Sequence, residues 1–359
     1  AAGGFDKNQA MRDEFAPLYP TALYSGGTSG NTGDGIRAGM AAGAETLNMQ
    51  SAWAAPVFYV PGEDRGRLCT IERALPGCIM INGSGERYLN EAASYHITGQ
   101  QMARRHAEHQ DASPSWMVFD ATYRGKFPMG PVYPGWPDFA LGPRVRKMLR
   151  KAPTIEALAR KIGVNPTALS ATIARFNQHA AKGEDPDFHR GEAAYDKMYG
   201  DPSQTPNPCL RPLDKGPFYA VPIYPGDIGT NGGLLTDEKA RVLDAKGKPI
   251  AGLYAIGNTS ADPVKLSITA SCGGCHADNY KSYKSTYHGQ ISTLGYAYTA
   301  KCFDCHGSHG IDKVTASWLL SEGIVAEIVV FWLGKQAMER FRPTTLMVVG
   351  GLGAVVVYF

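Results

Sequence analysis

Apolar and polar positions alternate most regularly between residues 154 and 183, where they predict two helices. Thr154 can cap a short helix that runs to residue 161, and Asn165 can cap a second one with Pro166 at its first helical position. The second helix carries an apolar stripe at Leu169, Ile173 and Phe176, and Gly183 follows its end. A stripe at this spacing is typical of core packing, so we expect both helices to be structural.

Short apolar runs farther along the chain predict strands. They lie at residues 221–224, 233–235, 240–243 and 252–256. Residues 244–247, Asp-Ala-Lys-Gly, predict a hairpin turn between the last two runs. We expect the last strand to be buried and to end at Gly257, where the backbone can approach a flat ligand and Asn258 can offer its amide. An ordinary strand-to-loop turn is the alternative.

A glycine-containing segment at residues 31–36, Asn-Thr-Gly-Asp-Gly-Ile, opens a run of small residues at 37–44. The run predicts a closely packed helix, and Gly33 and Gly35 allow a close approach to its N-terminus. Unpaired backbone N–H groups at a helix N-terminus favour anionic groups. The spacing of the glycines does not match the dinucleotide-binding fingerprint, so the motif alone carries little weight.

Composition restricts the function further. The chain has 359 residues, with 36 Lys and Arg against 33 Asp and Glu, and its formal charge of +3 gives no reason to expect a nucleic-acid partner. A hydrophobic fraction of 43% is enough to bury a large core over several domains. The 42 glycines and 24 prolines favour a loop-rich enzyme with α/β or α+β folds over a helical bundle.

Five segments carry a resemblance to known flavoproteins. They are residues 1–5, 31–44, 85–91, 185–191 and 226–260. In this order they resemble the succinate dehydrogenase/fumarate reductase-type flavoproteins, and among these the 3-ketosteroid dehydrogenases. The resemblance implies an α/β plus α+β fold: a Rossmann-like FAD-binding domain split into residues 1–55 and 217–261, with a catalytic domain at 56–216 inserted between. It also implies FAD contacts from Gly3, Gly4, Gly33, Asp34, Gly35, Gly257 and Asn258.

The same resemblance implies the chemistry. In the family a tyrosinate removes a proton beside a polarised ketone while the flavin accepts a hydride from the adjacent carbon, and Tyr95 stands where the family places that base. The substrate would be a steroid-like or enone small molecule, and the electron partner a quinone or a redox protein. The family's pyrophosphate loop, and its ketone-binding Tyr-Pro-Gly segment after residue 261, are not found in this sequence, so we expect this chain alone to bind FAD weakly or not at all. A fumarate-reductase-type enzyme is the alternative and would need cations such as Arg87, Arg104 and Arg105 around a dicarboxylate.

Two C-x-x-C-H motifs at residues 262–313 predict covalent attachment of two c-type haems, as in the multihaem cytochromes that this stretch resembles. The attaching thiols are Cys272 with Cys275 and Cys302 with Cys305. We expect His276 and His306 as proximal iron ligands and His288 and His309 as distal ones. A c-type cytochrome for electron transfer is therefore a second functional hypothesis, and a zinc site built from the two thiol pairs is the chemical alternative.

The final stretch, residues 314–359, contains two apolar runs around a basic loop and resembles a fragment of a major-facilitator transporter. It predicts an apolar helical tail with possible membrane contact, and an amphipathic hairpin is the alternative. The localisation stays open, because the flavoprotein part indicates cytoplasm, the haem motifs indicate periplasm and the tail indicates membrane. Residues 1–5 show neither the basic nor the apolar region of a signal peptide and suggest a start within a longer sequence. A chimera of three unrelated fragments is a further hypothesis.

Overall fold

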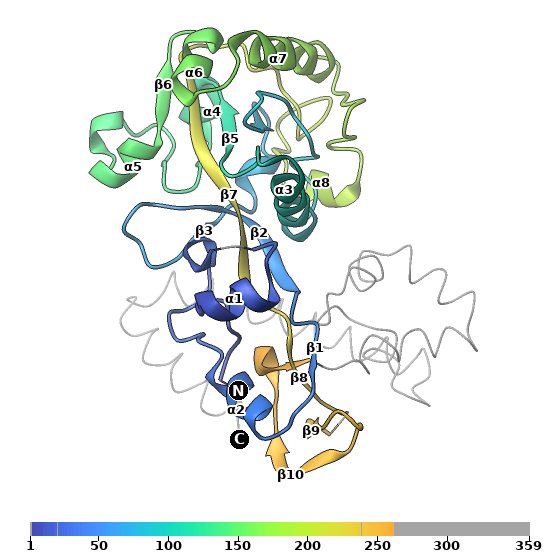
Figure 1. Cartoon of the computed structure of the whole chain (residues 1–359). Coiled ribbons are helices and arrows are strands. Elements are labelled where there is room, and N and C mark those ends of the chain that lie inside the picture. Colours follow the sequence, from blue (N-terminus) through green and yellow to red (C-terminus); the bar gives the residue numbers. More distant parts are fainter. Residues whose placement is uncertain (1, 20, 238, 262–359) are drawn as a thin grey trace, which may run out of the picture. The chain divides into compact units, whose positions relative to one another are not determined.

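The protein is described here by a computed structural model that covers residues 2–19, 21–237 and 239–261 (Figure 1). The predicted haem segment with its four cysteines and four histidines, and the predicted tail at 314–359, lie outside these described residues. Within them, no helix is long and apolar enough to cross a bilayer. Nor does this part of the chain bring together three or more His, Cys, Asp or Glu side chains that could hold a metal ion.

A six-stranded sheet is built around one long strand, β7 (Phe218–Thr230). Its other strands are β2 (Ala52–Phe58), β3 (Arg67–Leu68), β4 (Cys78–Ile81), β5 (Ser115–Phe119) and β6 (Arg150–Ala152). The first half of β7 pairs with β5 and β6, and its second half pairs antiparallel with β2 from Val57↔Tyr224 to Ala52↔Thr230. Figure 1 shows β7 as a long yellow ribbon that runs from beside α6 toward α1. The predicted domain borders near 55 and 217 therefore fall on β2 and just before β7.

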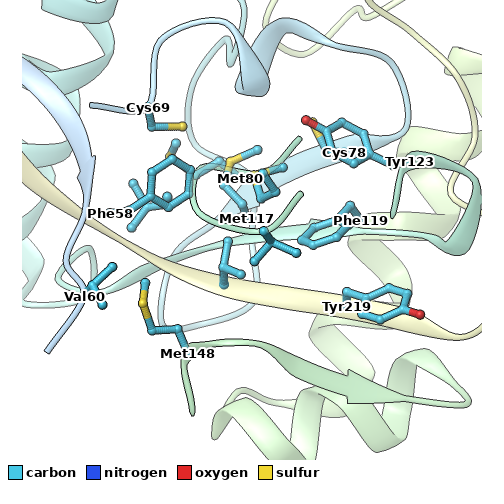
Figure 2. Close-up of a cluster of buried hydrophobic side chains, with 14 of the residues drawn as sticks. Phe58, Val60, Cys69, Cys78, Met80, Met117, Phe119, Tyr123, Met148 and Tyr219 are labelled. Atoms are coloured by element: carbon cyan, nitrogen blue, oxygen red, sulfur yellow. The ribbon is translucent and has the colours of Figure 1, made fainter. Parts of the chain in front are cut away.

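The two faces of this sheet bury different side chains, because successive residues of a strand point to opposite sides. Met80, Met117 and Tyr219 belong to one buried cluster, which Figure 2 shows together with Phe58 and Phe119. Their chain neighbours Ile79, Val118 and Ala220 belong to a second cluster on the other side. Two helices, α6 (Ile155–Ile162) and α7 (Pro166–Ala180), supply much of this second cluster.

These two helices confirm the prediction from the apolar stripe. The Thr154 side chain accepts a hydrogen bond from the Ala157 N–H, and the Asn165 side chain accepts from Thr167 and Ala168. The remaining helices are α1 (Gln9–Phe15), α2 (Asp34–Ala41), α3 (Tyr95–His109), α4 (Ala121–Lys126), α5 (Pro143–Met148) and α8 (Ala194–Met198). Four short 3-10 turns lie at Ala22–Tyr24, Glu72–Ala74, Asp138–Ala140 and Gly257–Thr259 among the described residues.

A smaller three-stranded sheet brings together three segments that are distant in the sequence. It has the order β1 (Thr46–Leu47), β8 (Gly233–Leu235) and β11 (Ser260–Ala261), and β11 runs parallel to β8. Helix α2 packs closely on β8, since a Cβ added at Gly39 would lie 2.3 Å from the Leu234 side chain. The expected tight packing of the small-residue run is thus confirmed.

Of the four predicted strands, those at 233–235 and 240–243 are confirmed as β8 and β9 (Arg241–Leu243), and the other two need correction. The hairpin turn is confirmed, because the Asp244 carboxylate accepts from the Lys246 and Lys248 N–H groups between β9 and β10 (Pro249–Tyr254). The expected buried strand at 252–256 was wrong: β10 ends at Tyr254, and Tyr254 and Ile256 are 64% and 59% exposed. The strand expected at 221–224 is instead part of the 13-residue β7.

Candidate active site

Tyr95 is the first residue of α3 and is half-buried. Ser94 caps the helix by accepting a hydrogen bond from the Ile97 N–H at 3.3 Å, so the direction of the first turn is fixed locally. The helix packs on β2 at very short range, since a Cβ added at Gly99 would lie 2.4 Å from the Ala55 nitrogen. Tyr95 therefore stands at the capped start of a helix whose middle packs against the sheet.

The loop before Tyr95 is anchored by buried charges. The Arg87 guanidinium donates to Glu91 at 2.7 and 2.8 Å and to Asp185 at 2.8 and 2.9 Å. Arg190, which is fully buried, lies 3.3 Å from the Glu91 carboxylate. Burial alone would raise the pKa of Glu91, but the two facing guanidinium groups outweigh it and hold this pKa below its usual range. Glu91 is thus a charged structural anchor four residues before Tyr95.

A third arginine, Arg73 in the 3-10 turn Glu72–Ala74, reaches the same loop from another segment. Its guanidinium donates to the carbonyls of Glu91 and Ala93 and, at 3.2 Å, to the Thr98 hydroxyl. Neither Arg73 nor Arg190 stood among the candidate residues of the sequence analysis. Both are buried, as Arg12 and Arg124 also are, and burial of an arginine leaves no local sequence signal.

The residues expected to contact FAD gather at one edge of the smaller sheet. Thr259 joins two of their segments, because its hydroxyl accepts from the Ala2 N–H at 3.0 Å and donates to the Gly3 carbonyl at 2.9 Å. Gly35 brings α2 to the same place, since a Cβ there would lie 2.9 Å from the Ala2 Cβ and 3.1 Å from Thr259. Residues 2–3, the start of α2 and the turn at 257–259 therefore meet, as the resemblance implied.

The glycines at this edge have different neighbours. A Cβ at Gly4 would lie 2.2 Å from the Thr230 hydroxyl, and one at Gly3 would lie 2.3 Å from the Asn31 amide. Gly33, with a positive φ of 77°, caps α2 and packs against Met11 and Phe5. Where they meet these neighbours, Gly3, Gly4 and Gly33 allow segments of the protein to approach one another closely. Gly257, by contrast, is exposed.

The chemistry of this edge fits part of an FAD molecule. Gly33 provides no side-chain cap, so the first backbone N–H groups of α2 need acceptors from outside the helix. Asp34 is exposed and its pKa is lowered, mainly by the hydrogen bond from Arg37, so its carboxylate accepts hydrogen bonds at neutral pH. The half-buried Asn258 adds an amide. Backbone donors with a carboxylate and an amide suit the hydroxyl groups and ring edge of a flavin better than its diphosphate, which a carboxylate repels.

Beneath this edge lie two fully buried carboxyl groups, Asp6 and Asp227. Arg12 pairs with Asp227 at 2.8 Å, while Asp6 accepts from the Ser25 hydroxyl at 3.1 Å and the Asn31 amide at 3.3 Å. Burial, and then the charge of Asp227, raise the pKa of Asp6. Sequence analysis missed this pair, because the two residues stand far apart in the chain.

Comparisons with known proteins agree with this arrangement. The 3-oxosteroid 1-dehydrogenase of Mycobacterium tuberculosis is 39% identical over an alignment of 272 residues, which covers 73% of this chain and 46% of that protein. The 4-oxocyclohexanecarboxylate 2-dehydrogenase of Sinomonas cyclohexanicum is 38% identical over 304 residues, covering 82% of this chain and 49% of that protein. The chain thus spans about half the length of these curated relatives.

A solved structure gives the same result. The 3-ketosteroid delta1-dehydrogenase from Sterolibacterium denitrificans, in complex with 1,4-androstadiene-3,17-dione, superposes with a TM-score of 0.69 at 44% identity. The superposition covers 73% of this chain and 47% of that one. A family model described as "FAD binding domain" matches residues 1–274, well over half of the sequence. On this match the chain belongs to the FAD-binding domain family.

Proposed function

We propose that the chain is part of an FAD-dependent oxidoreductase that introduces a double bond beside a ring ketone, with Tyr95 as the base. One observation carries the assignment of Tyr95: it stands at the start of a helix whose preceding loop is held by buried arginines on two sides. Such rigid placement is what proton transfer from a weakly acidic C–H requires. The inserted domain at 56–216 would supply this side of the site, and the segments around 2–36 and 257–259 the flavin side.

In this reaction the chain's own residues carry out the proton transfer. The deprotonated Tyr95 oxygen takes the proton from the carbon next to the ketone, and the C–H electron pair becomes the new C=C bond. Bound FAD would supply the two-electron oxidant by accepting a hydride from the adjacent carbon. Asp34, Asn258 and the first turn of α2 would hold the cofactor, as their donor and acceptor set allows.

Three other tyrosines, Tyr19, Tyr24 and Tyr88, are less suited to act as the base, because their pKa values are raised. Burial raises the pKa of Tyr19 to about 12, and burial with neighbouring phenols raises that of Tyr24 to about 12. A phenol with a raised pKa is protonated at neutral pH and is a poor base. Burial also raises the pKa of Tyr88. The choice of Tyr95 itself rests on the resemblance and on the geometry of α3.

The ring-ketone substrate class is supported by the relatives and by the arginines. Both curated relatives bear the name of a substrate with a ring ketone, one an oxosteroid and the other an oxocyclohexane. A dicarboxylate substrate would need available cations. Arg87 is committed to Glu91 and Asp185, and Arg105 donates to Asp111 at 2.6 and 2.9 Å. Two of the three arginines considered for a fumarate-type enzyme are therefore engaged elsewhere.

The test is Tyr95→Phe in the holoprotein, with bleaching of the flavin absorbance as the readout. We expect reduction of FAD by a 3-oxosteroid or by 4-oxocyclohexanecarboxylate to slow by roughly 10²- to 10⁴-fold, the usual contribution of a general base. FAD content should stay unchanged. Tyr199→Phe is the matched control, since Tyr199 is also half-buried but packs against Tyr195 at the end of α8. Equal rates for Tyr95→Phe and the control would refute the assignment of the base.

A further inference from the structure

Arg73 is a buried arginine whose hydrogen-bond partners are neutral. Only 2% of its surface is exposed, and it donates to the carbonyls of Cys69, Glu91 and Ala93 and to the Thr98 hydroxyl. Three of these four acceptors lie within four residues of Tyr95 in the chain. A planar guanidinium fixes several acceptors at defined angles, which a flexible ammonium cannot do.

Arg73 is itself held in place by Arg190. The Arg190 guanidinium donates to the Arg73 carbonyl at 3.0 Å, to the Leu75 carbonyl at 2.9 Å and to the Cys78 carbonyl at 2.8 Å. The turn that carries Arg73 is therefore attached to the start of β4. Two buried arginines in series connect the sheet to the loop before α3.

Thr98 completes the connection from within the helix. Its hydroxyl is fully buried, accepts from Arg73 and donates to the Ser94 carbonyl at 3.1 Å, one turn back. Arg73 thus contacts both sides of Tyr95: the loop carbonyl at Ala93 before it and the side chain of Thr98 after it. Displacement of the first turn of α3 would break contacts on both sides.

We propose that Arg73 is a positioning residue that sets the place of the Tyr95 phenol in the reaction. This inference rests on the proposed function, because it assumes that Tyr95 is the base. A displacement of about 1 Å at a reacting group can cost on the order of 100-fold in rate. Arg73 would act on the proton-transfer step through Tyr95, and substrate binding would depend on it little.

The main test compares Arg73→Lys, which keeps the charge but loses the planar set of donors, with Arg124→Lys. Arg124 is a matched control: it is 6% exposed and also donates to two loop carbonyls, those of Tyr133 and Trp136. In the holoprotein we expect Arg73→Lys to lower kcat by ~10- to 100-fold with KM within about twofold. Thr98→Val, a smaller change, should lower kcat in the same direction if Arg73→Lys does not fold.

A double variant separates positioning from a general effect on the fold. If Arg73 acts through Tyr95, Arg73→Lys added to Tyr95→Phe should reduce the rate by less than about twofold further. Amide hydrogen exchange at residues 94–98, which needs no cofactor, should become faster in Arg73→Lys and stay unchanged in Arg124→Lys. The inference would be overturned if the rate losses of the two substitutions multiplied in the double variant, or if amide exchange at residues 94–98 stayed unchanged. Full activity of Tyr95→Phe alone would instead refute the proposed function.

Discussion

At the residue scale, the burial of Asp6 ties stability to pH. Burial and the charge of Asp227 raise the pKa of Asp6 above its usual value of 3.8. An acid with a raised folded-state pKa binds its proton more tightly in the native than in the unfolded protein. Its contribution to the free energy of unfolding is therefore most favourable below the unfolded pKa, and declines as pH rises from there through the folded pKa.

Asp6→Asn should remove this pH dependence. The amide keeps an oxygen that can accept from Ser25 and Asn31, but it carries no charge. We expect the free energy of unfolding of the variant, relative to the parent, to increase as pH rises from about 4. Asp34→Asn is the control of opposite sign, since the pKa of the exposed Asp34 is lowered and its stabilisation is lost as pH falls. Urea unfolding between pH 4 and 8 measures both; parallel curves for Asp6→Asn and the parent would contradict the prediction.

At the element scale, α3 depends on a glycine where it crosses β2. A Cβ at Gly99 would lie 2.4 Å from the Ala55 nitrogen and 2.7 Å from the Ala54 carbonyl carbon, and backbone atoms cannot move aside. We expect Gly99→Ala to lower the free energy of unfolding by about 1–3 kcal/mol or more, the cost of overpacking. Gly125→Ala in α4 is the control, because its Cβ would meet no atom within 4 Å and should stabilise the helix by about 0.5–1 kcal/mol. Equal denaturation midpoints for the two variants would count against this account of the contact.

The sequence predicted the capped helices α6 and α7 and the short strands β8 and β9, but neither the burial of β10 nor the length of β7. Thr154 and Asn165 form their caps with N–H groups two or three residues away, so the signals for α6 and α7 are local. The exposure of β10 depends on what packs against it, and an apolar run cannot show that. Pro222 and Pro225 argue against one long strand in the sequence, because proline is rare inside strands. Both nevertheless lie within β7, where they stand opposite Trp116 and Pro56 in the sheet.

Some residues of the candidate site could be expected from the sequence, and others could be found only in the structure. Family resemblance indicated Tyr95 and the flavin edge, whose segments the structure brings together around Thr259. The positions of Arg73, Arg190 and Asp227 follow only from the packing of segments distant in the sequence. At Gly35 and Gly4 the close neighbours are protein side chains, of Ala2 and Thr259 in the first case and of Thr230 in the second, so the expected approach of a ligand to these glycines stays a prediction.

At the scale of the whole described structure, one buried ion network joins segments about a hundred residues apart. Arg87 binds Glu91 four residues on and also Asp185, while Arg190 reaches back to Glu91 and to the start of β4. A buried network of this kind can be costly to form, yet removal of one member leaves uncompensated charge. Glu91 is its central acceptor, since it also accepts from the Met80 N–H at 3.0 Å.

Glu91→Gln should therefore destabilise the protein far more than the loss of one surface ion pair. We expect a loss of about 3–5 kcal/mol in the free energy of unfolding, because Arg190 stays buried without a carboxylate at that position. Glu63→Gln is the matched control: Glu63 also pairs with an arginine four residues on, but Arg67 is 47% exposed, and the expected loss is below about 1 kcal/mol. Chemical denaturation at pH 7 compares the two. Similar losses would mean that the Arg87–Glu91–Arg190 network does not hold the loop before Tyr95, and the rigidity assigned to that tyrosine would then need another source.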